Sequence, residues 1–366
     1  MSEGGVYSCG PGGHDGGSGG RVARRNGRHK VIDIHCHLAI PAADALMRPH
    51  QVPGAISINS FSSPASDTVN REQFAKIGKK LASIDEHIAD MDATGVDIQA
   101  ISPSPGQYYY WSEPELGLQA ARMVNDGMAE AVARHPDRLV GMGTVPLQSP
   151  ELAVRELKRL TKDLGLRGVE ISSNVNGREL ADPEFRPFFA AVEELGVLVF
   201  MHPLGFTHGQ RLSEHYFNNL IGNPLESTIA VGHLIFGGVL DDHPGLKLCV
   251  AHGGGYLPGY IGRMDHAFRA REDCRQHIHR EPSTYLRQLY FDTLVFDRRE
   301  LKYLVETYGA DHLMMGTDYP FDMSEADPVG FHSELSEADR EKILGGTAGR
   351  LLGLPATRPA RAGRAR

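Results

Sequence analysis

Cysteine is scarce in this sequence, and the few cysteines lie far apart. The four are Cys9, Cys36, Cys249 and Cys274 in a chain of 366 residues, and no two of them form a Cys-x-x-Cys pair. This spacing excludes the disulfide framework that holds small secreted domains together. Free thiols are usual in a reducing compartment, so we predict a cytoplasmic location.

Long apolar runs and an excess of basic charge are also absent. No stretch approaches the ~20 apolar residues that a membrane-spanning helix needs, and the N-terminus has no apolar segment of the signal-peptide kind. The formal net charge is −8, from 38 basic and 46 acidic side chains. This balance argues against a nucleic-acid-binding protein. We therefore expect neither a membrane nor a nucleic acid as a partner.

Both ends of the chain differ in composition from the middle. Residues 1–29 contain GGHDGGSGG followed by a basic stretch, and residues 356–366 read ATRPARAGRAR. Neither composition can bury an apolar core, so both tails are expected to be disordered. One domain is expected between them, over residues 30–355.

Eight short apolar runs alternate with helical patterns in this middle part. Most are nearly continuous in Val, Ile, Leu and Met, as in parallel strands covered on both faces. The runs span residues 30–38, 97–104, 138–147, 166–173, 196–204, 246–254, 289–296 and 312–321. The alternation predicts an α/β fold, the (β/α)8 or TIM barrel. The polar, Pro/Ser-rich segment 39–78 predicts a small insertion or lid after the first strand.

Histidines and one aspartate stand at the ends of four predicted strands. His35 and His37 end the first strand, and His202, His252 and Asp318 end the fifth, sixth and eighth. The carboxyl ends of the strands in such a barrel meet at one mouth, where catalytic residues gather. Because side chains alternate along a strand, the two histidines of the first strand share a face, and Cys36 points the other way.

Imidazole and carboxylate groups in this combination are typical ligands of a borderline divalent ion such as Zn²⁺. His35 and His37 alone could be local structural residues, but the partners on three other strands favour a metal site. Two further features stay open. Asp33 shares the face of His35 and is either a support for the site or a satisfied core carboxylate. The aromatic run 108–111 either lines a pocket for a planar substrate or packs within its loop.

Several motifs together resemble the amidohydrolase superfamily, and within it the branch of 2-amino-3-carboxymuconate-6-semialdehyde decarboxylases. They are IDIHCHL, DMDATGVDIQAIS, His-Pro at 202–203, AHGGGYLPGYIGRMDHAF and MGTDYPF. The resemblance covers about residues 30–353. Its most specific parts are the AHGGG stretch with the GR that follows it, and GTDYPF.

The resemblance implies one metal ion, Zn²⁺ with Mn²⁺ as the alternative. Residue by residue, it implies the following roles: His35, His37, His202 and Asp318 as metal ligands, Asp318 also in catalysis, His252 as the acid/base beside the metal-bound water, Arg263 and Arg71 as carboxylate-binding arginines, and Phe321 in the pocket wall. It also implies a homodimer or a higher homo-oligomer, in which Arg263 reaches across a dimer interface. Strand four offers Glu170 where dinuclear relatives carry a carboxylated lysine, which implies one metal rather than two.

The implied activity is non-oxidative decarboxylation of a small unsaturated or aromatic carboxylic acid. The same apparatus could hydrolyse a lactone, ester or amide, or hydrate a double bond, and the sequence leaves this alternative open. One departure from the family pattern concerns the substrate. The muconate decarboxylases have Trp-Asp after the His-Pro of strand five, where this chain has Leu204-Gly205. The change argues against the muconate semialdehyde itself as the substrate.

Overall fold

The computed structural model of the chain describes residues 30–55, 57 and 60–355. The two predicted tails, 1–29 and 356–366, lie outside these residues, so their predicted disorder stays a prediction.

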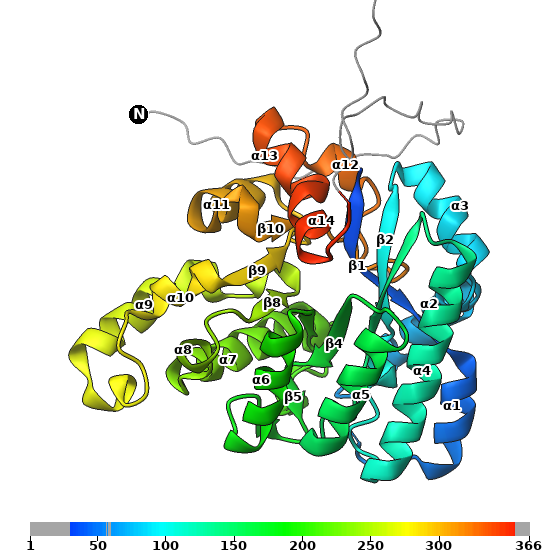
Figure 1. Ribbon diagram of the computed structural model, residues 1–366, viewed down its shortest axis with the longest axis horizontal. Helices are drawn as coiled ribbons and strands as arrows, with labels where there is room; N and C mark the ends of the chain where they lie inside the picture. Colours follow the sequence, from blue (N-terminus) through cyan, green and yellow to red (C-terminus); the bar gives the residue numbers. More distant parts are fainter. Residues whose placement is uncertain (1–29, 56, 58–59, 356–366) are drawn as a thin grey trace, which may run out of the picture.

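Eight parallel strands form a barrel and follow one another in sequence order around it (Figure 1). They are β1 Ile32–Leu38, β2 Ile98–Pro103, β3 Leu139–Gly143, β4 Gly168–Ser172, β7 Leu198–His202, β8 Lys247–Val250, β9 Leu289–Asp292 and β10 Leu313–Met314. Almost every strand residue is buried, because helices cover the outside of the barrel and side chains fill its inside. The predicted (β/α)8 barrel is confirmed.

Fourteen α-helices accompany the strands within the described residues. They are α1 Pro41–Met47, α2 Pro64–Ala82, α3 Ile84–Thr94, α4 Pro114–Arg134, α5 Pro150–Lys162, α6 Arg186–Leu195, α7 Asn223–Phe236, α8 Val239–Asp242, α9 Leu257–Ala270, α10 Pro282–Tyr285, α11 Arg298–Tyr308, α12 Pro328–Phe331, α13 Glu337–Glu341 and α14 Thr347–Leu351. None of the helices in this part of the chain is long and apolar enough to cross a membrane. A short hairpin, β5 Asn174–Val175 and β6 Arg178–Glu179, follows β4.

The barrel closes where the first and last strands meet. The amide of Ile34 donates to the carbonyl of Met315 at 2.9 Å, and the amide of His37 donates to the carbonyl of Tyr319 at 2.8 Å. β10 itself is shorter than the predicted run 312–321: it ends at Met314, and the chain turns further on at Asp318, whose φ is 61°. The closing contacts therefore lie beside the strand ends that carry the predicted metal ligands.

The predicted sixth strand, 246–254, also ends early. β8 stops at Val250, and a tight turn follows in which His252 has φ 57° and Gly253 has φ 63°. A Cβ at Gly253 would lie 2.6 Å from a methyl group of Val295, so the turn needs glycine there. The turn holds His252 at the barrel mouth instead of within the strand ladder.

The predicted insertion contains α1 and most of α2. α2 runs beyond the predicted end at residue 78, and α3 follows it directly before β2. The side chain of Ser63 caps α2 by accepting the amide of Ser66 at 3.3 Å. The first β/α unit therefore carries three α-helices.

Candidate metal centre and active site

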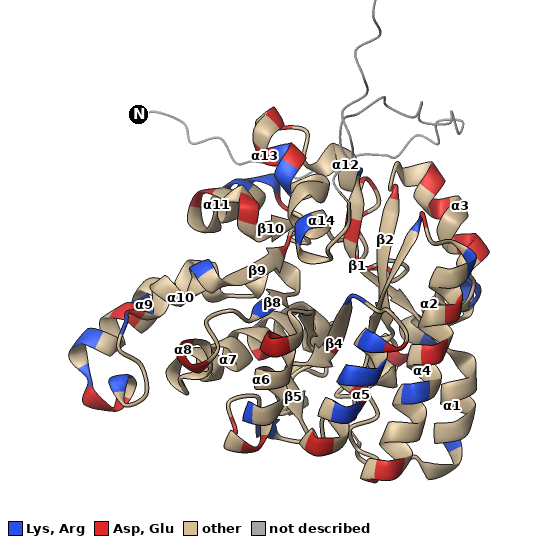
Figure 2. Cartoon of the chain, in the orientation of Figure 1, with Lys and Arg blue, Asp and Glu red and all other residues tan. Residues whose placement is uncertain are grey.

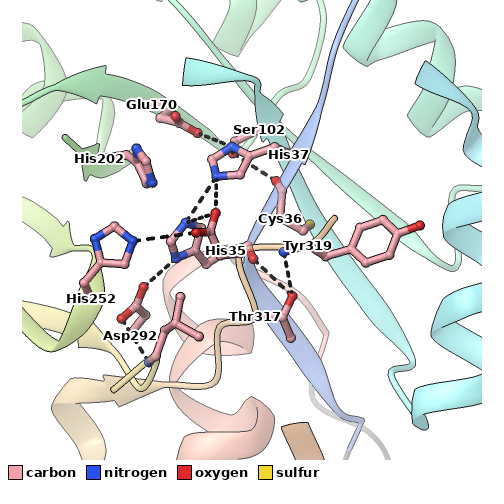
Figure 3. Close-up of polar contacts among 12 residues, drawn as sticks. His35, Cys36, His37, Ser102, Glu170, His202, His252, Asp292, Thr317 and Tyr319 are labelled. Atoms are coloured by element: carbon pink, nitrogen blue, oxygen red, sulfur yellow. Dashed lines mark hydrogen bonds and ion pairs between the residues drawn. The ribbon is translucent and has the colours of Figure 1, made fainter. Parts of the chain in front are cut away.

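The residues predicted to bind metal converge at the mouth of the barrel (Figure 3). Ligand atoms of His35, His202, His252 and Asp318 all lie within 4.8 Å of one another. His37 joins them, with its Nε2 3.2 Å from Nε2 of His35 and 3.1 Å from Oδ1 of Asp318. Segments far apart in the sequence thus build one cluster.

Hydrogen bonds behind the rings orient the two histidines of β1. Nδ1 of His35 lies 2.6 Å from Oδ2 of Asp292, and Nδ1 of His37 lies 3.0 Å from the carbonyl oxygen of Pro103. These oxygens accept, so each Nδ1 carries a proton and each Nε2 faces the cluster, where a metal ion would take the place of a second proton. Metal-ligating histidines are commonly oriented in this way.

The remaining groups also suit a divalent ion. Neither ring nitrogen of His202 has a hydrogen-bond partner among the described residues, although both are buried. Burial holds the pKa of His202 well below its usual range, so its imidazole is neutral. The imidazoles together with one carboxylate, Asp318, form a donor set that fits Zn²⁺ or a similar ion.

The electrostatics of the cluster favour a positive charge at its centre. Burial alone would lower the pKa of His35, but the carboxylates of Asp318 and Asp292 raise it to about 10. Burial alone would raise the pKa of Asp318, but the imidazoles around it, His35 first, hold it well below its usual range. A metal cation would meet the same attraction.

The acid/base candidate His252 stands at the edge of the cluster. Its Nε2 lies 3.9 Å from Oδ2 of Asp318, and its side chain is 16% exposed, whereas those of His35 and His37 are fully buried. It can therefore reach both the metal position and a molecule entering from the mouth.

The two predicted arginines are not brought to the cluster within one chain. Arg263 is exposed on α9, and Arg71 is exposed on α2, where it donates to Oγ1 of Thr68 at 3.1 Å. Phe321 lies close to the cluster, with its ring centroid 5.5 Å from that of His37. It lines a cavity of about 50 Å³ together with His202 and Asp318.

A second and larger cavity, of about 280 Å³, lies nearby. The aromatic run 108–111 lines it, together with Glu226 and residues 172–174 at the carboxyl end of β4. This placement favours the pocket-wall interpretation of the run. Leu204 and Gly205 line both cavities, so the segment after β7 separates them.

The structure also assigns the buried carboxylates that support the cluster. Asp33 accepts the Oγ1 hydroxyl of Thr317 at 2.7 Å, the amide of Thr317 at 3.1 Å and the amide of His35 at 3.1 Å. It therefore holds β1 against the segment that carries Asp318 and is more than a core residue. Glu170 is fully buried, accepts a hydrogen bond from Tyr108 and lies 3.8 Å from Nδ1 of His37, outside the ligand cluster.

Asp292 was missed by the sequence reasoning. It ends β9 as His202 ends β7, so the signal was available: a carboxylate at the carboxyl end of an apolar strand. Its Oδ1 accepts the amide of Gly253 at 2.9 Å while Oδ2 contacts His35.

Comparison with known proteins places this barrel and its cluster in one class of enzyme. The model of the amidohydrolase family matches residues 32–354, so the chain belongs to the amidohydrolase family. The resemblance expected from the sequence is confirmed. The chain is 37% identical over 332 residues to 2-amino-3-carboxymuconate-6-semialdehyde decarboxylase of Dictyostelium discoideum, covering 89% of this chain and 92% of that protein.

Solved structures agree with this assignment. The 5-carboxyvanillate decarboxylase of Sphingomonas paucimobilis matches with a TM-score of 0.80 and 27% identity, over 89% of this chain and 99% of that one. The 5-carboxyvanillate decarboxylase of Novosphingobium aromaticivorans, complexed with manganese, matches with a TM-score of 0.80 and 26% identity, over 89% and 96%. The predicted class, a decarboxylase of this superfamily, is confirmed. The cluster and the manganese-bound neighbour support a divalent metal ion.

Proposed function

We propose that this chain releases CO₂ from a small aromatic or unsaturated carboxylic acid at a single divalent-metal site. The observation that carries the proposal is the convergence of His35, His37, His202 and Asp318 beside a cavity at the barrel mouth. These four side chains would hold the ion. When bound, the ion supplies Lewis-acid charge that stabilises a developing oxyanion. We take Zn²⁺ as the first candidate and Mn²⁺ as the second.

The reaction also needs a proton at the carbon that bears the carboxylate. His252 would deliver it, since an imidazole can give and take protons near neutral pH and this ring faces both cluster and mouth. The C–CO₂ bond then breaks, and its electron pair returns to the ring or conjugated system. Phe321 would form one wall against the planar part of the acid.

A carboxylate substrate calls for a cation, and we propose that a second copy of the chain supplies it. α9 extends away from the barrel and carries basic positions (Figures 1 and 2). Arg263 is exposed there beside Tyr260, whose exposed fraction is 62%. An exposed aromatic next to an arginine is typical of a protein interface. We propose a homodimer in which Arg263 grips the partner's substrate, with Arg71 as a second carboxylate-binding candidate.

The buried, unpaired thiols of Cys36 and Cys249 fit the proposed cytoplasmic location.

The test combines metal analysis of the purified protein with a screen for CO₂ release. The acids are 2,6-dihydroxybenzoate, 5-carboxyvanillate and 2-amino-3-carboxymuconate-6-semialdehyde. We expect close to one equivalent of Zn²⁺ or Mn²⁺ per chain and CO₂ from at least one aromatic acid. Proton release from lactones or esters by a metal-loaded protein that yields no CO₂ would favour the hydrolase alternative.

A further inference from the structure

The side-chain amide of Asn218 joins three separate segments at the barrel mouth. Asn218 begins the π-helical turn η5, Asn218–Gly222, just before α7, and it is 7% exposed. Its Oδ1 accepts the amide of Phe206 at 3.0 Å, in the loop after β7. Its Nδ2 donates to the carbonyl of Ser60 at 2.8 Å, in the segment before α2. One side chain therefore ties that segment to the loop after β7.

Three glycines surround this amide and leave room for it. A Cβ at Gly205 would lie 2.6 Å from Nδ2 of Asn218, and a Cβ at Gly209 or Gly222 would lie 2.8 or 2.7 Å from its Oδ1. Side chains at these positions would displace the amide, since contacts under 3.0 Å are essentially never seen. Gly205 also has φ 77°, a conformation that other residues rarely adopt. The three glycines therefore form a close-fitting slot around the side chain of Asn218.

The loop that Asn218 holds is fixed almost entirely by side chains. Asn223 accepts the amide of Gly205 at 2.8 Å, and Glu226 accepts the amide of Thr207 at 3.3 Å. With Asn218 on Phe206, three consecutive amides of a loop outside any helix or strand are held from η5 and α7. The Asn218 hydrogen bond is the central one of the three.

This loop is the wall between the two cavities. Leu204 and Gly205 line both, and Asn218 lines the one that contains His202 and Asp318. A shift of the loop would change the room beside the metal cluster without touching a ligand. Nearby, Tyr216 lines the same cavity with a left-handed φ of 62°, and strained backbone of this kind gathers at functional sites.

We propose that Asn218 is a positioning residue that holds the wall formed by residues 204–207 and locks the segment at Ser60 onto it. The effect expected on substrate binding rests on the proposed function. The effect on the position of residues 204–207 does not, and it can be measured without enzyme turnover.

Hydrogen exchange on the full chain tests the hold directly. Asn218→Ala should speed exchange at the amides of residues 205–207 about fivefold, since a lost net hydrogen bond costs about 1 kcal/mol. Gly205→Ala should act in the same way from the opposite side. Asn218→Asp keeps the acceptor for Phe206 but loses the donor to Ser60, so residues 205–207 should stay closer to wild type. Unchanged exchange in both alanine variants would overturn the proposal.

Asn125 provides a matched control. It is also buried, and its side chain makes two hydrogen bonds with the backbone of Thr144: Nδ2 donates to the carbonyl at 2.9 Å, and Oδ1 accepts the amide at 2.8 Å. Unlike Asn218, it lies on α4. Asn125→Ala should lower stability without changing exchange at residues 205–207. Equal acceleration in this variant would show general loosening and would also overturn the proposal.

Kinetics separate positioning from a purely structural role. For the acid that releases CO₂ in the screen above, Asn218→Ala should raise KM about tenfold and change kcat much less, with Asn218→Asp in between. Metal affinity, measured by titration with Mn²⁺, should stay at the wild-type value. A matching loss of kcat and metal affinity would contradict the assigned role. Asn218→Ala could speed exchange at residues 205–207 in a protein that decarboxylates none of the acids. That result would refute the proposed function but still support the role of Asn218 in positioning the loop.

Discussion

His35 and Asp292 form the shortest of the hydrogen bonds that orient the cluster histidines: Nδ1 of the imidazole lies 2.6 Å from Oδ2 of the carboxylate, and both side chains are fully buried. The other carboxylate oxygen accepts the amide of Gly253, the residue after His252. One aspartate therefore sets the ring of a proposed metal ligand and the turn that carries the proposed acid/base.

Asp292→Asn should weaken metal binding while the protein stays folded. The amide can still accept from Gly253, but its NH₂ group would then face Nδ1 of His35. That nitrogen would have to accept, which moves the proton to Nε2, where the metal would bind. We expect a loss in affinity for Zn²⁺ or Mn²⁺ of about 10- to 100-fold, measured by competition with a chromogenic chelator. Asp265→Asn removes a carboxylate that accepts the amide of Ser283, far from the cluster, and should bind metal normally.

Removing a proposed ligand should abolish metal binding and activity together. His35→Ala and Asp318→Ala each delete a central donor of the cluster. Metal content by elemental analysis and CO₂ release should fall in parallel. Full occupancy with wild-type turnover in either variant would mean that the ion binds elsewhere.

His252→Ala should separate catalysis from metal binding. If His252 moves a proton, the variant keeps its metal and loses roughly 10²- to 10⁴-fold in kcat. Elemental analysis and the CO₂-release assay measure the two effects separately. Loss of the ion instead would make His252 a ligand, a role that its distance to the other donor atoms allows.

Arg263→Ala should raise KM for the acid and leave metal content unchanged. Mixed dimers test whether the arginine acts across the interface. A dimer of one Arg263→Ala chain and one His252→Ala chain should regain about a quarter to a half of the activity, since one site is then complete. No recovery would contradict the proposal that Arg263 acts across the interface and would place it in its own chain's site.

Stability should fall in mild acid because of His332. Its ring is buried, with Nε2 2.9 Å from Oγ1 of Thr293 and Nδ1 2.7 Å from the carbonyl of Pro328, and burial lowers its pKa from 6.5 to about 4. Between these two values the unfolded chain binds a proton that the folded chain does not. The free energy of unfolding should therefore drop by up to about 3 kcal/mol as pH falls from 6.5 to 4. His332→Gln should flatten this part of the urea-denaturation profile.

Much of the site can be predicted from the sequence because two simple rules determine where its side chains lie. Alternation along a strand puts His35 and His37 on one face, and the barrel rule brings the carboxyl ends of distant strands together. Asp292 does not stand out in the sequence, because it is a single carboxylate after three apolar or aromatic residues. Its role depends on its contact with the ring of His35, and that contact exists only in the closed barrel.

Other features depend on backbone geometry that composition does not report. The early end of β8 and the left-handed turn at His252 come from tertiary contacts around Gly253. The slot around Asn218 needs three glycines that are separated in sequence and meet only in the folded chain. The resemblance to the family implies that Arg71 binds the substrate carboxylate, but within one chain its side chain is exposed to solvent.

The closure of the barrel has a consequence for synthesis on the ribosome. The amide of Asp318 donates to the carbonyl of His35 at 2.8 Å, so the seam between first and last strands runs through the metal cluster. A nascent chain that has emerged only as far as β7 holds His35, His37 and His202 but lacks the carboxylate. The proposed metal site can therefore be completed only once nearly the whole chain is made.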